Sequence, residues 1–132
     1  LPKLVRDGFR GQIISTPGTK AIAQLVLEDG LKVIHEHCVT TEQKDLYTPE
    51  DIIQTLNQWQ TVSYGETWTH KELRVTFFDA GHILGSAFIH ISVDQRNDQR
   101  SSASIVFSGD LGNSPNPILP DTVPLPATAT RE

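Results

Sequence analysis

A histidine and an aspartate occupy similar positions in the second half of the chain, and both side chains can bind a metal ion. His82 lies in the stretch FFDAGHILGSA, residues 77–87, directly after Gly81. Asp110 lies in the stretch FSGD, directly after Gly109. Imidazole and carboxylate groups are both zinc ligands in proteins, and the adjoining glycines leave room for a close approach to the backbone. The pair is therefore a candidate metal site.

Each of these residues follows a segment that predicts a strand. RVTFF ends just before Asp79, and SIVFSG ends just before Asp110; both segments are rich in aromatic and β-branched residues. Because SIVFSG is a continuous apolar run, we expect it to be buried on both faces. Loops held by a rigid sheet commonly carry functional side chains. We therefore expect the imidazole of His82 and the carboxyl of Asp110 to converge on a cavity at the rim of the sheet.

The first half of the chain predicts helices. A short strand at residues 11–15 leads to Thr16-Pro17, which is typical of a helix start, and Gly30 is expected to end that helix. Continuation of the helix through residues 31–37 is the alternative.

A second helix is expected to begin at Thr48-Pro49 with a capping box and to end near Gln58. Its buried stripe is predicted to consist of Ile52, Ile53 and Leu56.

The second half predicts further strands in WQTVSY and SAFIHISVD, and a hairpin connection around Asn97-Asp98. Helices followed by strands of this density favour an α/β fold, with helices packed on a mixed sheet.

Composition narrows the class of protein. The chain has 132 residues, enough for one domain, and carries a net charge of −5, which argues against nucleic-acid binding by charge alone. No apolar run approaches the roughly 20 residues that span a bilayer, so no membrane association is expected. Cys38 is the single cysteine, which excludes an internal disulfide and favours a reducing, cytoplasmic location. The start at Leu1 and the proline-rich end predict a piece of a longer protein.

DAGHILGSA and FSGDLG together resemble the third and fourth motifs of the metallo-β-lactamase superfamily, in particular its β-CASP branch of RNA-processing nucleases. The segments LYTPEDIIQTL and PNPILPDTVPLP are similar to that branch in the same order. HILGSA and SGDLG are most like the cleavage-and-polyadenylation and archaeal type. The resemblance implies that residues 1–132 form an incomplete metallo-β-lactamase domain, from the segment after the HxHxDH motif up to the start of the β-CASP cap.

The HxHxDH motif itself is absent from the sequence. His35-Glu36-His37 begins like it, but Cys38-Val39-Thr40 follows where the motif requires Asp and His. We interpret His35 and His37 as solvent-exposed helix residues.

The resemblance implies a zinc-dependent hydrolase that cleaves RNA phosphodiester bonds, as in mRNA 3′-end processing. His82 would bind the first of two zinc ions and Asp110 would bridge both, so these two residues are the predicted catalytic and metal-binding residues. RNA is the expected substrate of the full-length protein, with an RNA-processing complex or a homodimer as the expected assembly. We expect the isolated chain to lack activity. The alternatives are a hydrolase of the same fold that acts on a thioester or lactone, and a metal-free scaffold in an RNA-processing complex.

Other polar residues have simpler interpretations. Asp79 is predicted to cap its loop, with support of a ligand as the alternative, and Ser86 to form the turn into the next strand. His70 and His90 are expected to be structural, and Cys38 an inert thiol.

Overall fold

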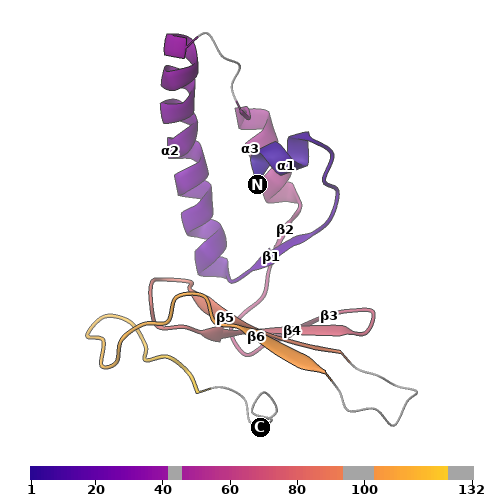
Figure 1. The fold of residues 1–132 in the computed structure, drawn as a ribbon, viewed down its shortest axis with the longest axis vertical. Coiled ribbons are helices and arrows are strands. Elements are labelled where there is room, and N and C mark those ends of the chain that lie inside the picture. Colours follow the sequence, from indigo (N-terminus) through magenta and orange to yellow (C-terminus); the bar gives the residue numbers. More distant parts are fainter. Residues whose placement is uncertain (42–45, 94–102, 125–132) are drawn as a thin grey trace. The chain divides into compact units, whose positions relative to one another are not determined.

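The computed structural model describes residues 1–41, 46–93 and 103–124, and for residues 37–41 it describes the backbone only. The chain forms two compact units. The first unit contains Leu1–Ser15 and Thr19–Thr61, and the second contains Thr16–Gly18 and the chain from Val62 onward. In chain order the elements (Figure 1) are α1 (Pro2–Arg6), β1 (Ile13–Ser15), α2 (Pro17–Thr41), α3 (Pro49–Asn57), β2 (Trp59–Thr61), β3 (Thr67–His70), β4 (Leu73–Asp79), β5 (Ala87–Val93) and β6 (Ser104–Phe107).

The first unit combines helices with one pair of parallel strands. β1 and β2 are parallel, with Ile13 opposite Trp59. The Trp59 indole donates a hydrogen bond of 2.8 Å to Ser15 Oγ, and Lys20 Nζ donates one of 2.8 Å to the Trp59 carbonyl. The first bond joins β2 to β1, and the second joins the start of α2 to β2. The buried apolar side chains of the unit are Val5, Tyr47, Ile52 and Trp59.

The capping box predicted for α3 is present. Thr48 Oγ1 accepts a hydrogen bond from the Asp51 amide at 3.4 Å, and Asp51 Oδ2 accepts one from the Thr48 amide at 2.9 Å. The predicted stripe is only partly correct, because Ile53 is 58% exposed. The buried face of α3 consists instead of Asp51, Ile52 and Thr55. Two polar side chains are buried there because each has a hydrogen-bond partner.

The prediction that Gly30 ends the first helix is wrong, since α2 continues through it to Thr41. Gly30 is not among the glycines with positive φ that would mark a helix end. A Cβ at Gly30 would lie 3.4 Å from the Tyr47 hydroxyl, which donates a hydrogen bond to the Leu27 carbonyl at 3.3 Å. That separation is ordinary van der Waals contact, so Gly30 lies beside Tyr47 without being required there for steric reasons. No described helix, α2 included, is both long and apolar enough to cross a bilayer.

The second unit is built on an antiparallel sheet with the strand order β3-β4-β5-β6 (Figure 1). Phe78 lies opposite Phe88, and their rings stack with centroids 5.1 Å apart. Phe77 and Phe88 are both buried. The sequence predicted β4, β5 and β6 as strands and placed Trp68 and His70 in a hairpin-like region; this region is the β3–β4 hairpin, where His70 stacks on Trp68. Helices with parallel and antiparallel pairing confirm the α/β class, although the two kinds of pairing occur in separate sheets.

The prediction that SIVFSG is buried on both faces is wrong. Among the described residues β6 has one neighbour, β5, and so forms an edge of the sheet. Ile105 and Phe107 are each 53% exposed. A continuous apolar run does not distinguish a central strand from an edge strand whose faces are uncovered. The antiparallel pairing of β5 with β6 agrees with the predicted hairpin, but Asn97-Asp98 lies outside the described residues.

The capping box leads to the first prediction. Replacing Thr48 with Ala should lower the stability of the chain by about 1 kcal/mol, because the Asp51 amide loses its acceptor at the start of α3. Urea denaturation followed by far-UV circular dichroism measures the change. Thr48→Ser retains the hydroxyl and should behave like the wild type. A Thr48→Ala midpoint equal to that of the wild type would contradict this role for the capping box.

Candidate metal site

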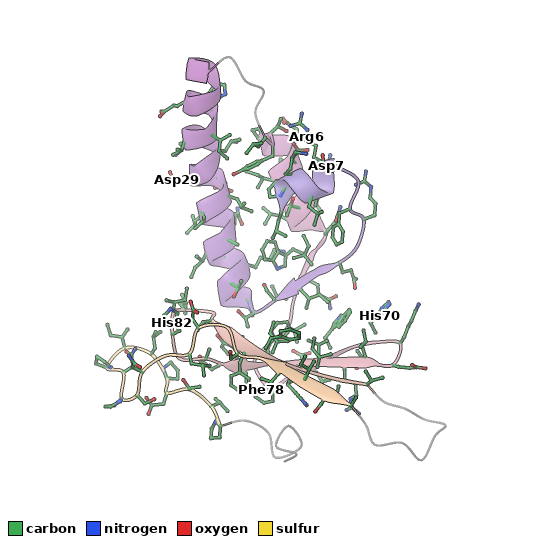
Figure 2. All side chains as sticks on the ribbon, in the orientation of Figure 1. Arg6, Asp7, Asp29, His70, Phe78 and His82 are labelled. Carbon is green, nitrogen blue, oxygen red and sulfur yellow. The ribbon has the colours of Figure 1, made fainter. Side chains whose placement is uncertain are left out.

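The loop that carries His82 is a short, hydrogen-bonded turn between β4 and β5. His82 is labelled in Figure 2. The Ala80 amide donates to the Ser86 carbonyl at 3.2 Å, and the Ser86 amide donates to the Ile83 carbonyl at 3.0 Å. Gly81 and Gly85 both have positive φ, +63° and +83°, which side chains other than glycine rarely adopt. The glycines on either side of the histidine are therefore required by the reversal of the chain.

Two side chains inside this loop satisfy its free amides. Asp79 Oδ1 accepts a hydrogen bond from the Gly81 amide at 2.8 Å, which is the loop-capping geometry predicted for it. Ser86 Oγ lies 3.2 Å from the His82 amide and 3.1 Å from the Ile83 amide and accepts from both. Ser86 does form the predicted turn, but it also fixes the backbone at the histidine itself.

The loop that carries Asp110 follows β6 and lies against the first loop. The Gly112 amide donates a hydrogen bond to the Ala80 carbonyl at 2.7 Å. A Cβ built on Gly112 would overlap the carbonyl of Gly81, so the close approach of the two backbones requires a residue without a side chain. Thr122 adds a second connection, because its hydroxyl donates to the same Ala80 carbonyl at 2.8 Å.

These contacts bring the two predicted site residues together. Nε2 of His82 lies 3.9 Å from Oδ2 of Asp110, and the side chains are 45% and 88% exposed. The expected proximity of the two groups is confirmed, whereas the cavity expected around them stays a prediction. Both side chains are accessible, so neither has its position determined by burial.

The separation of the two atoms is compatible with a shared metal ion. Two ligands at about 2.1 Å from one zinc ion lie at most about 4.2 Å apart, and closer in tetrahedral coordination. The 3.9 Å between Nε2 and Oδ2 falls inside this limit. Because both side chains are exposed, a small rotation of either reaches the shorter spacing. An imidazole and a carboxylate are also a suitable donor pair for zinc.

The described residues supply only these two groups. No cluster of three or more His, Cys, Asp or Glu side chains suitable for a metal occurs in residues 1–36, 46–93 and 103–124. His35 lies exposed on α2, as expected, while the side chain of His37 lies outside the described residues. His90 lies within β5, and its buried Nε2 has no hydrogen-bond partner among the described residues.

Two further residues contact the His82 loop, although the sequence did not indicate a functional role for either. Thr16 Oγ1 donates to the Gly85 carbonyl at 2.7 Å, and the Tyr64 hydroxyl donates to the Ser86 carbonyl at 2.8 Å. Burial raises the pKa of the Tyr64 phenol above its ordinary value, and the charge of Asp79 raises it further. The phenol is therefore a hydrogen-bond donor at neutral pH. Thr16 was interpreted as part of a helix start, and nothing in the sequence indicated a partner 69 residues away.

Comparison with known proteins identifies ribonucleases among the relatives of the chain. No family model matches the chain. The chain is 37% identical over 121 residues to ribonuclease TTHA0252 of Thermus thermophilus. The aligned region covers 92% of this chain and 25% of the Thermus protein. It is 30% identical over 122 residues to endoribonuclease ysh1 of Emericella nidulans, with 92% of this chain and 13% of the relative covered. Endoribonuclease YSH1 of Gibberella zeae is 32% identical over 107 residues.

The chain thus spans about a quarter of the length of the Thermus relative and less of the fungal ones. The match to the Thermus and Emericella proteins extends over nearly all of the chain, well beyond the two short motifs around His82 and Asp110. These relatives are RNA-processing nucleases of the kind that the two motifs resemble. The chain belongs to the metallo-β-lactamase superfamily, in its β-CASP branch of RNA-processing nucleases.

Proposed function

We propose that the chain is part of the catalytic domain of a zinc-dependent hydrolase that cleaves RNA phosphodiester bonds. The observation that carries the proposal is the 3.9 Å separation of His82 Nε2 and Asp110 Oδ2 at the ends of two connected loops. The names of the relatives, a ribonuclease and endoribonucleases, favour RNA over a thioester or lactone as the substrate. Retention of both groups in one place also favours a metal-binding enzyme over a metal-free scaffold.

In this proposal the two side chains hold zinc, His82 through Nε2 and Asp110 through its carboxylate. Zinc bound there would supply positive charge to the scissile phosphate and lower the pKa of an attacking water. His82 must be neutral to act as a ligand, and Asp110 must be ionised. The exposure of both side chains leaves the site accessible to a phosphate on a large, flexible substrate.

The proposal also accommodates the acidic composition of the chain. A net charge of −5 gives little general attraction for a polyanion. In a metal-centred site the attraction comes from the ions that contact the phosphate, so the chain itself does not need a basic surface there. The remaining metal ligands and the basic RNA-binding surface belong, in this proposal, to parts of the full-length protein outside these 132 residues.

A substitution at Asp110 in the full-length protein tests the proposed role. Asp110→Ala should lower RNA cleavage by more than about 100-fold, because even groups that only support metal ligands contribute 10- to 100-fold. It should also reduce the zinc content by at least one ion, since a bridging carboxylate is shared by both. Cleavage of a labelled RNA and elemental analysis by mass spectrometry measure the two effects.

The matched control is Glu72→Ala, which removes an exposed carboxylate from the turn between β3 and β4. It should leave turnover and zinc content unchanged. If Asp110→Ala kept near-normal turnover and full metal content, the assignment of Asp110 would be wrong.

The 132-residue chain alone should bind zinc weakly and should not cleave RNA. It supplies two ligands from its described residues, whereas structural and catalytic zinc sites use at least three protein ligands. Calorimetric titration with Zn²⁺ tests the first expectation, with Asp110→Ala in the same chain as the reference. Tight binding at one ion per chain, lost in Asp110→Ala, would show that the chain holds a complete site.

A further inference from the structure

The loop that carries His82 is held at its far end by two hydroxyl groups from distant parts of the second unit. Thr16 Oγ1 donates to the carbonyl of Gly85 at 2.7 Å, and the Tyr64 hydroxyl donates to the carbonyl of Ser86 at 2.8 Å. The two acceptors are the carbonyls of consecutive residues, so the two donors hold adjacent peptide groups. The donors lie 69 and 22 residues from their acceptors.

The two donors differ in their surroundings. Thr16 is 1% exposed, so its bond to Gly85 is shielded from water. A Cβ on nearby Gly18 would lie 2.8 Å from Gly85 Cα, which shows that the two backbones are in direct contact. Tyr64 is 40% exposed and reaches the loop from the segment between β2 and β3. The loop is thus held from two segments that lie far apart in the sequence, and the Thr16 side chain also hydrogen-bonds the Tyr64 phenol.

Ser86 transmits this restraint to the histidine. Its carbonyl accepts from both the Tyr64 hydroxyl and the Ala80 amide, and its hydroxyl accepts from the amides of His82 and Ile83. A shift of Ser86 therefore moves the acceptor of the His82 amide. The orientation of the imidazole depends on this backbone, because the side chain is 45% exposed and packing does not hold it.

We propose that Thr16 and Tyr64 are positioning residues, which fix the 80–86 loop so that His82 faces Asp110 at ligand distance. The proposal rests on the proposed function for its catalytic consequence, but the restraint itself is a property of this loop. A metal ligand must be held within a fraction of an ångström for full activity. Deleting either hydroxyl should let the loop sample other conformations without removing a ligand.

The test uses three variants of the full-length, zinc-loaded protein. Thr16→Val and Tyr64→Phe each delete one hydroxyl with little change in shape, whereas Thr16→Ser retains the donor. The matched control is Thr76→Val, which removes a hydroxyl from the Thr67–Thr76 hydrogen bond within the same sheet. Like the deletions, it removes one hydrogen-bonding hydroxyl, but from outside the loop.

The first readout is amide hydrogen exchange of the peptide that spans residues 77–87, measured by mass spectrometry. Exchange there should become about tenfold faster in Thr16→Val and in Tyr64→Phe, which is the effect of losing one typical hydrogen bond. Thr16→Ser and Thr76→Val should exchange in this peptide like the wild type. Unchanged exchange in both hydroxyl deletions would overturn the proposal.

The second readout is RNA cleavage. Both deletions should lower kcat about tenfold with KM within about twofold, because substrate binding is retained while the ligand geometry is disturbed. Thr16→Ser should restore kcat. A wild-type protein that cleaves no RNA would contradict the proposed function, while the exchange data would still report on the restraint. Faster exchange with unchanged kcat in an active enzyme would contradict the positioning role alone.

Discussion

The structure of the site depends on one close contact between two backbones. The Gly112 amide donates to the Ala80 carbonyl, and Gly112 lies so close to Gly81 that no side chain fits at position 112. Neither His82 nor Asp110 is buried, so no packing of their own side chains determines the distance between them. The backbone contact between the two loops therefore sets that distance. The relative position of the two exposed side chains is therefore determined by glycines that have no functional group of their own.

The sheet explains how the contact is maintained. The pairing of Asp79 with Ala87 closes the base of the first loop, and β6 pairs with β5 so that the second loop starts from the neighbouring strand. Stacking of Phe78 on Phe88 and burial of Phe88 stabilise the β4–β5 pair next to the base of the histidine loop. The apolar residues of the strands therefore serve the site indirectly, because they keep the two loop origins in a constant register.

Local signals in the sequence predicted local structure well. The Thr48-Pro49 start of α3 and the strands on either side of the DAGHILGSA loop follow from residue types at short spacing. The proximity of His82 to Asp110 follows from their positions directly after two predicted strands and from the resemblance of the two motifs. Predictions failed where the structure depends on contacts between residues that are far apart in the sequence or on the packing of the whole unit. Gly30 lies inside α2, beside Tyr47 from a segment farther along the chain, and Ile53 is exposed because the fold buries Asp51 and Thr55 instead. The hydroxyls of Thr16 and Tyr64 have no signature near their acceptors, so only the fold reveals them.

The open edge of the sheet has a practical consequence for anyone who handles this chain. Ile105 and Phe107 on β6 are largely accessible, and the described residues place no strand beyond β6. Such an edge can add a strand from another molecule, and apolar side chains next to free backbone donors and acceptors strengthen that tendency. Dilute samples and charged substitutions on β6 should keep the chain dispersed, and turbidity at high concentration would have its origin there.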